Sequence, residues 1–249
     1  MDEFINLTPE NLKTEHICCK ICLKKESEGV LRKKSWLEEQ FKFGHTFRKL
    51  NKKDATVFIE YAPLETALVP IIGKNYLYIY CLWTLGQYRG KGYGKQLLDY
   101  AVLDAKKQGK SGLCVLGSKS KKTWLTNSDF FKANGFKVVD ETKSGYELLA
   151  LSFDDSFPKF SESAKNEQIQ SLNLTIYYND ECPYVSKSVE IVKNFCNENK
   201  IPVDFIRVDD LFLAKNLPAV FNNFAVFYKG KFETVNLLDL AYLKRILKK

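Results

Sequence analysis

Long apolar segments are missing from this chain of 249 residues. No apolar run approaches the roughly 20 residues that a membrane-spanning helix needs. The start, Met1-Asp2-Glu3, is acidic and no apolar core follows it, which does not fit a signal peptide. We therefore expect a cytoplasmic protein with no membrane partner.

A regular cysteine framework is missing too. The seven cysteines are odd in number and irregularly spaced, so we expect free thiols rather than disulfides. Cys18, Cys19 and Cys22 cluster with His16, but Cys19-x-x-Cys22 has no second pair downstream. Zinc sites usually combine two such pairs, whereas a free cysteine packs like a small apolar residue. The pattern favours buried cysteines on an amphipathic strand, and we expect no metal.

Motifs for nucleic-acid binding are also absent. No zinc-finger, helix-turn-helix or RNA-binding phrase accompanies the net charge of +8, so we expect no nucleic-acid partner. The lysines and arginines are scattered, with short runs at 32–34, 119–122 and 248–249. An apolar content of 45% and an aromatic content of 14% indicate a well-buried globular protein. This length can hold one large domain or two small ones.

The most informative segment is the glycine-rich stretch from Gln87 to Lys95. An apolar run, residues 76–85, precedes it, and an apolar-periodic run, residues 97–105, follows it. This order predicts a strand, a tight turn and a helix. Backbone N–H groups at a helix start carry the positive end of the helix dipole and bind phosphate groups.

Glycines and basic side chains share this turn. The glycines allow a positive φ and a close approach of a ligand to the backbone, and the basic residues add positive charge. They are Gly90, Gly92 and Gly94, with Arg89, Lys91 and Lys95. The turn is suited to a pyrophosphate.

Two common nucleotide-binding signatures are missing from the turn. It has no Gly-Lys-Ser/Thr ending, and its spacing is G-x-G-x-G rather than the dinucleotide G-x-G-x-x-G. Instead, Gln-x-x-Gly-x-Gly at Gln87, Gly90 and Gly92 resembles the acetyl-CoA loop of the GNAT acyltransferase superfamily. The phrase from Phe130 to Phe136, which ends in Gly-Phe, resembles the phrase that closes the fourth helix of that superfamily.

The elements expected around these phrases agree with the resemblance. Strands are expected at 56–62, 76–85, 112–117 and 146–153, with a helix at 127–134. The resemblance covers roughly residues 1–155. It implies an α/β (α+β) fold with a mixed, mostly antiparallel sheet and flanking helices.

The remainder of the chain reads as a second domain. Residues 156–172 are polar and read as a linker. The expected order βαβ…ββα in residues 173–249, with Cys182-Pro183-Tyr184 at the first helix start, resembles the thioredoxin/glutaredoxin fold. A GNAT domain (residues 1–155) followed by such a domain is similar to the YoaP-like family of bacterial acetyltransferases.

The resemblance implies an N-acyltransferase with acetyl-CoA as cosubstrate. In GNAT enzymes, a strand that splays from its neighbour offers free backbone groups to the pantetheine arm, and an N–H there polarises the thioester oxygen. The pyrophosphate is expected on residues 89–94. The expected cofactor-binding residues are Leu82, Trp83, Thr84, Gln87, Arg89, Gly90, Lys91, Gly92, Tyr93, Gly94 and Lys95.

The groups that move protons are less well defined. Glu60, on the strand 56–62, is the candidate general base, because a partly buried carboxylate gains basicity by desolvation. Glu60 facing solvent, or pairing with a lysine, is the alternative. The superfamily often places a tyrosine four residues before its Gly-Phe as a general acid, but Phe131 stands there in this chain. The acceptor is expected to be a small-molecule amine or a peptide, and the oligomeric state stays open.

Two other functions compete with acyl transfer. Cys182 at a helix start could support monothiol, glutaredoxin-like chemistry, because a helix N-terminus favours the thiolate. Val185 replaces the second cysteine of that motif, and Asn222-Asn223 stand where the fold usually has a cis-proline. A non-catalytic module that binds acyl-CoA is the third possibility.

Overall fold

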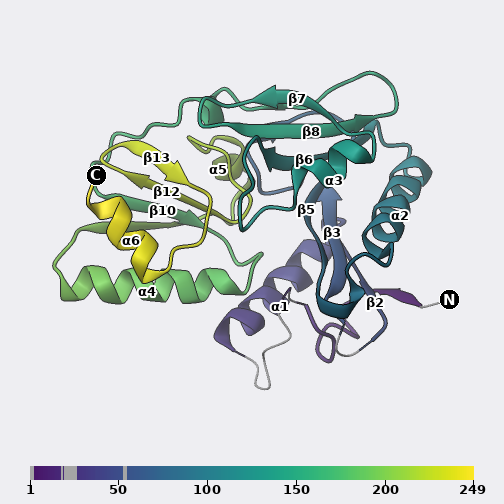
Figure 1. Ribbon diagram of the computed structural model, residues 1–249, viewed down its shortest axis with the longest axis horizontal. Helices are drawn as coiled ribbons and strands as arrows, with labels where there is room; N and C mark the ends of the chain where they lie inside the picture. The colour runs from purple at the N-terminus through teal and green to yellow at the C-terminus, as the bar shows by residue number, and fades with distance from the viewer. Residues whose placement is uncertain (1–2, 18, 20–26, 53–54) are drawn as a thin grey trace. The chain divides into compact units, whose positions relative to one another are not determined.

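The chain folds into two compact units. The computed structural model describes residues 3–17, 19, 27–52 and 55–249. The first unit comprises Met1–Ala67 and Ile71–Lys159, and the second comprises Leu68–Pro70 and Phe160–Lys249 (Figure 1). The domain limits 1–155, 156–172 and 173–249 stay a prediction.

A seven-stranded sheet organises the first unit, in the order β1-β2-β3-β5-β6-β8-β7. Every pair is antiparallel except β5 with β6, which is parallel. The predicted mixed, mostly antiparallel sheet is therefore confirmed. The strands are β1 (Phe4–Asn6), β2 (Thr46–Leu50), β3 (Val57–Pro63), β5 (Tyr76–Thr84), β6 (Gly112–Ser118), β7 (Lys137–Glu141) and β8 (Tyr146–Ser152).

Helices cover both faces of this sheet. On β3, side chains alternate: Ile59 packs in a core with Leu98 of α2 (Tyr93–Lys107), whereas Glu60 contacts Lys33 of α1 (Glu28–Phe41). The two helices therefore lie on opposite faces, as Figure 1 shows. A short third helix, α3 (Ser128–Ala133), follows β6. A separate two-stranded sheet joins β4 (Ile71–Ile72) and β9 (Lys159–Phe160).

The second unit is built on a four-stranded sheet in the order β11-β10-β12-β13. Its β10–β11 pair is parallel and is connected by α4, while the other pairs are antiparallel. This element order is the one expected, and the thioredoxin-like assignment stays a prediction. The elements are β10 (Leu174–Tyr178), α4 (Tyr184–Glu198), β11 (Val203–Arg207), α5 (Leu211–Lys215), β12 (Phe224–Tyr228), β13 (Lys231–Thr234) and α6 (Leu240–Leu247).

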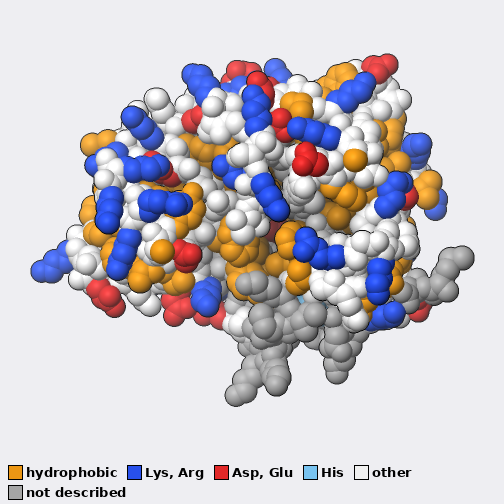
Figure 2. All heavy atoms as spheres, viewed as in Figure 1, with side chains coloured by type: hydrophobic (Ala, Val, Ile, Leu, Met, Phe, Trp, Pro, Cys, Tyr) orange, Lys and Arg blue, Asp and Glu red, His pale blue; other side chains and the backbone are white. Residues whose placement is uncertain are grey.

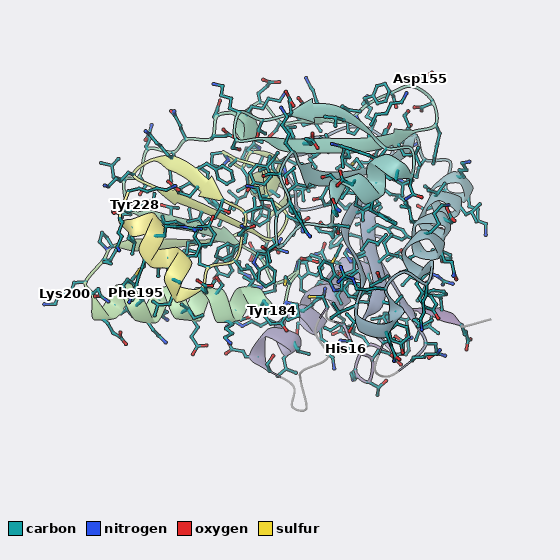
Figure 3. The ribbon with its side chains drawn as sticks, viewed as in Figure 1. His16, Asp155, Tyr184, Phe195, Lys200 and Tyr228 are labelled. Atoms are coloured by element: carbon teal, nitrogen blue, oxygen red, sulfur yellow. The ribbon has the colours of Figure 1, made fainter. Side chains whose placement is uncertain are left out.

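Side chains join the two long helices of this unit. Figure 3 labels Tyr184 and Phe195 at the two ends of α4. The ammonium of Lys244 on α6 lies 5.4 Å from the centre of the Phe195 ring. Ser188 Oγ donates to the Leu238 carbonyl and accepts from the Leu238 N–H, at 2.9 and 2.7 Å. The polar and aromatic contacts together fix α4 beside α6.

Part of the polar segment at 156–172 makes backbone hydrogen bonds within the second unit, which includes residues 160–172. Glu167 N–H donates to Pro218 at 2.9 Å, and Glu167 C=O accepts from Phe232 at 3.0 Å. The Ile169 N–H donates to Gly230 at 2.9 Å. Backbone groups form such hydrogen bonds whatever the side chains are, so the segment shows no apolar periodicity. Its polar sequence was therefore interpreted as a linker.

The described helices include none that is long and apolar enough to cross a membrane. Figure 2 shows Lys and Arg side chains spread over the visible face rather than gathered in one patch. This distribution fits the scatter of basic residues along the sequence.

Candidate functional site

Strands β5 and β6 separate half-way along their length. Their parallel pairing runs from Tyr76–Gly112 to Ile79–Val115, whereas β5 continues to Thr84 and β6 to Ser118. On its other side, β5 stays paired with β3 from Leu77 to Thr84, apart from one register shift. Residues 80–84 of β5 therefore turn one backbone edge toward a gap in the sheet.

The backbone of Leu82 points into this gap. The register of β3 and β5 shifts so that Tyr80 is an extra residue, which makes a β-bulge directly before the gap. The Leu82 N–H donates to Thr126 Oγ1 at 3.4 Å, and the Leu82 C=O accepts from the same hydroxyl at 3.2 Å. Backbone groups alternate along a strand, so Thr84 faces the gap as well and Trp83 faces β3.

The glycine turn connects β5 to α2 through left-handed backbone. Gly90 and Gly92 have φ values of 72° and 80°, and Gly92 is the N-cap residue of α2. A Cβ added at Gly90 would meet nothing within 4 Å. Gly94 does not use a positive φ, because it already lies in the first turn of α2. The turn thus leaves an open, side-chain-free surface at positions 90 and 92.

The N-terminus of α2 is electrostatically suited to an anion. The first N–H groups of a helix have no partner within it, and no side chain caps this one. The first turn contains no acidic residue. Arg89 and Lys91 are exposed beside it, while Lys95 is paired with Asp99. Backbone N–H groups and basic side chains therefore converge where the sequence predicted a pyrophosphate.

The strand end and the helix start are neighbours in space. A Cβ built at Gly94 would lie 3.6 Å from a methyl group of Leu82 and from the ring of Phe130. The rings of Tyr88 and Tyr93 are 5.8 Å apart, centre to centre. The predicted residues from β5, the turn and α2 thus form one continuous region, with Gln87 exposed on the short helical turn Gly86–Tyr88.

Glu60 lies in a different setting from the one expected. Its side chain is fully buried, its Oε1 lies 2.5 Å from Lys33 Nζ, and its Oε2 lies 3.4 Å from His45 Nε2 without a hydrogen bond. Lys33 and His45 are themselves buried. In this geometry Glu60 is the counter-ion of Lys33. Pairing with a lysine was the alternative to the general-base role in the sequence analysis. The general-base role stays a prediction.

His45 shares the buried pocket of Glu60. Its ring packs against Trp36 and Tyr80, with ring centres 5.2 and 5.3 Å away. Burial lowers the pKa of His45 below its ordinary value of 6.5; the nearby Glu60 opposes this shift and Lys33 adds to it. The folded protein therefore resists protonation of His45.

This shift predicts a loss of stability on mild acidification. Below about pH 6.5 the unfolded chain takes up a proton at residue 45 more readily than the folded chain, so the free energy of unfolding falls as the pH falls. Melting temperatures measured between about pH 7.5 and 5.5 should decline less steeply in His45→Phe than in the natural protein. His16→Gln removes the other histidine and should keep the decline. Equal slopes in the natural protein and His45→Phe would contradict this explanation.

Phe131 lies inside the core of the first unit. It is fully buried, and its ring centre is 5.5 Å from that of Phe130 and 5.1 Å from that of Phe136. The side chain at this position has no proton to donate and does not reach solvent. A general acid is therefore not supplied from this part of α3.

Two residues with hydroxyl groups near the gap were not among the site residues expected from the sequence. Thr126 bonds to Leu82 as described, and Ser128 Oγ makes the matching pair of bonds to the N–H and C=O of Ser118, at 3.0 and 3.2 Å. The signal in the sequence is a hydroxyl on either side of Asn127, the N-cap residue of α3. Thr126 and Leu82 are 44 residues apart and Ser128 and Ser118 are 10 apart, and each pair joins two different elements, so spacing alone does not reveal them.

Cys182 lies just before α4 in the second unit. It is half-buried, and Pro183 is the N-cap residue of the helix. The Asn179 N–H donates to the Asn223 C=O at 3.1 Å, and Asn223 Nδ2 donates to Glu181 at 2.6 Å. Asn223 is thus adjacent to the cysteine turn, and the described residues include no cis peptide bond.

Metal ligands are not grouped in the described part of the chain. No set of three or more His, Cys, Asp or Glu residues there is positioned to hold a metal ion. Of the cysteine cluster near the start, Cys18 and Cys22 lie outside the described residues, and Cys19 is half-buried.

Comparison with known proteins identifies relatives for both units. The acetyltransferase (GNAT) domain family matches residues 54–138, and the YoaP-like family matches residues 202–248. The uncharacterized N-acetyltransferase YoaP of Bacillus subtilis (strain 168) is 32% identical over 247 residues, which are 98% of each chain.

Solved structures are also similar to the chain. The PaiA N-acetyltransferase of Thermoplasma acidophilum, in complex with coenzyme A, is 20% identical with a TM-score of 0.43, over 61% of this chain and 99% of that one. A GNAT family acetyltransferase of Brucella melitensis, in complex with acetyl-CoA, is 11% identical with a TM-score of 0.42, over 65% and 94%.

Proposed function

Because the chain belongs to the YoaP-like family of GNAT N-acetyltransferases, we propose that it transfers an acetyl group from acetyl-CoA to a primary amine. The observation that carries this proposal is the gap between β5 and β6, which opens directly before the glycine turn and α2. A strand edge whose N–H and C=O groups have no neighbouring strand suits an amide-containing arm such as pantetheine. The start of α2 suits the pyrophosphate.

In this proposal, different groups of the protein bind the pyrophosphate and the pantetheine arm of acetyl-CoA. The pyrophosphate lies on the backbone of residues 89–94, with Arg89 and Lys91 supplying positive charge. The pantetheine arm pairs with the Leu82 C=O and with the gap-facing groups of Thr84, and the Leu82 N–H is kept for the thioester oxygen. Backbone direction matters more than side-chain identity in both places, because N–H groups make most of the contacts.

In the chemical step, the Leu82 N–H is the hydrogen-bond donor that polarises the thioester carbonyl. The amine nitrogen attacks the thioester carbonyl carbon, the oxygen gathers negative charge beside this N–H, and the C–S bond then breaks. The amine loses a proton, and the CoA thiolate leaves. Phe131 has no proton to give the thiolate, which therefore leaves without help or is protonated by another group. Glu60 stays the candidate base, with its ion pair to Lys33 as the competing explanation.

Binding and turnover test this proposal separately. Calorimetric titration with acetyl-CoA should give one site per chain, and free thiol should appear only when an amine from a panel of small amines and peptides is added. Absence of acetyl-CoA binding would overturn the proposal. Binding without thiol release on any amine would favour a non-catalytic acyl-CoA-binding module instead.

Replacement of the cysteine in the second unit tests the redox alternative. In Cys182→Ser, the rate of amine-dependent thiol release should stay within about twofold of the natural protein, because the proposed chemistry lies entirely in the first unit. The melting temperature controls for folding. A tenfold loss of rate in a folded Cys182→Ser protein would move the chemistry to the second unit.

A further inference from the structure

The gap between β5 and β6 is occupied by side-chain hydroxyls from one segment of chain. Thr126 Oγ1 accepts from the Leu82 N–H and donates to the Leu82 C=O, at 3.4 and 3.2 Å. Ser128 Oγ does the same for Ser118 at the end of β6, at 3.0 and 3.2 Å. In a continuous sheet, a neighbouring strand would supply these hydrogen bonds. Here one hydroxyl supplies them to β5 and the other to β6.

The two hydroxyls differ in how firmly they are held. Ser128 and Ser118 are both buried, and a Cβ at Gly117 would come within 2.5 Å of Ser128 Oγ. This close packing makes Ser128 a fixed part of the core. Thr126 is half-buried, lies outside the helix that begins at Ser128, and receives the longer N–H bond. Of the two contacts, the one made by Thr126 is the weaker and the more accessible.

The contact with Leu82 coincides with the proposed position of the acyl group. A ligand that pairs with the gap-facing edge of β5 needs the Leu82 N–H, to which the Thr126 hydroxyl is bonded. One N–H cannot make two strong, well-aligned hydrogen bonds at once. Ligand and Thr126 therefore compete for the same backbone group.

We infer that Thr126 is a positioning residue that closes the acyl site in the absence of ligand and gives way to acyl-CoA. The inference rests on the proposed function. In the ligand-free protein the hydroxyl satisfies the N–H and C=O of Leu82, and in the complex the thioester oxygen takes over the N–H. The hydroxyl thus keeps the open strand edge paired at the expense of affinity for the cosubstrate.

The competition between Thr126 and the ligand predicts that affinity for acetyl-CoA rises when the Thr126 hydroxyl is removed. Removal of a side chain that merely supports the fold weakens ligand binding, whereas removal of the Thr126 hydroxyl should strengthen it. Ligand-free Thr126→Val leaves the Leu82 N–H and C=O without their hydroxyl partner, and the thioester oxygen of acyl-CoA gives the N–H a partner again. The dissociation constant for acetyl-CoA should therefore fall by about twofold to tenfold.

The experiment compares Thr126→Val with Thr126→Ser, which keeps the hydroxyl. Acetyl-CoA should bind the valine variant more tightly, and the serine variant should match the natural protein within about twofold. KM for acetyl-CoA should fall in the valine variant while kcat stays unchanged. The ligand-free valine variant should melt below the serine variant, and saturating acetyl-CoA should narrow this difference.

The possible outcomes separate this inference from the function on which it rests. Equal or weaker acetyl-CoA binding by Thr126→Val, with normal binding by the natural protein, would overturn the role of Thr126 and leave the proposed function intact. Absence of binding by all three proteins would overturn the proposed function itself. If Thr126→Val does not fold, Thr126→Ala removes the same hydroxyl from a half-buried position and is judged by the same criterion.

Discussion

Replacement of Gly90 by aspartate is expected to weaken acetyl-CoA binding by at least about a hundredfold. Gly90 has a φ of 72° and open space around its Cβ position, and Asp tolerates left-handed backbone better than most residues. The variant should therefore fold. Its carboxylate would lie beside the proposed pyrophosphate, and two like charges about 4 Å apart near a protein surface repel by about 4 kcal/mol. Calorimetry with acetyl-CoA measures the loss.

Two control variants show whether the loss of affinity depends on the charge of the new side chain and on its position at residue 90. Gly90→Asn has nearly the same size without the charge and should lose no more than about tenfold in affinity. Gly109 lies just beyond the other end of α2, with a φ of 64° and nothing within 4 Å of its Cβ position. Gly109→Asp should leave the affinity unchanged. If the two aspartate variants bind acetyl-CoA equally well, the pyrophosphate does not lie on this turn.

Replacement of Lys33 by methionine is expected to lower the free energy of unfolding by about 3–5 kcal/mol. Lys33 and Glu60 form an ion pair with both side chains almost wholly buried. Loss of the ammonium leaves the Glu60 carboxylate without a counter-charge beside a histidine that burial keeps from protonating. Denaturation in urea or guanidinium chloride measures the change.

An exposed ion pair on the same helix provides the control. Lys42 pairs with Glu39 at the end of α1, where both side chains are more than half exposed, so Lys42→Met should cost less than about 1 kcal/mol. The double variant Lys33→Met/Glu60→Gln should regain much of the lost stability, because neither charge remains. If Lys33→Met costs no more than Lys42→Met, the buried ion pair is not a stabilising feature.

The double variant also decides the role of Glu60. It has no carboxylate at residue 60, and its core is free of unpaired charge. If Glu60 is the general base, amine-dependent thiol release should fall by about a hundredfold or more with acetyl-CoA affinity unchanged. A rate near that of the natural protein would assign Glu60 to the ion pair alone.

Local signals made the strand, the glycine turn and the helix of the proposed cosubstrate site predictable from the sequence. The strand expected at 76–85 is β5 at Tyr76–Thr84, and the glycine turn follows it directly. The helix expected at 97–105 begins earlier, at Tyr93. Its first turn, Tyr93-Gly94-Lys95, carries no apolar periodicity, and the N-cap is a glycine rather than a typical capping side chain. The pattern therefore revealed the helix but not its start.

Helix α1 and strand β7 were not predicted because their sequences break the usual patterns. The buried positions of α1 include Val30, Lys33 and Trp36, so a lysine interrupts the apolar stripe that would reveal the helix. The residues of β7, Lys137–Glu141, are largely exposed or half-buried at the edge of the sheet. Without a buried face, no alternation marks them as a strand.

Partners distant in the chain account for further differences at the candidate site. Glu60 was placed on the correct strand, but its burial depends on Lys33, which is 27 residues away on α1. Thr126 lies 44 residues from Leu82. Such contacts depend on how helices and strands pack, and no spacing within a single segment encodes them.

A crystal structure of the protein with acetyl-CoA tests the proposed site most directly. The pyrophosphate should lie within hydrogen-bond distance of the backbone N–H groups of residues 89–94, and the thioester oxygen should lie on the Leu82 N–H with Thr126 displaced. Acetyl-CoA bound elsewhere, with the start of α2 empty and the Thr126–Leu82 contact intact, would contradict both the cosubstrate site and the role of Thr126.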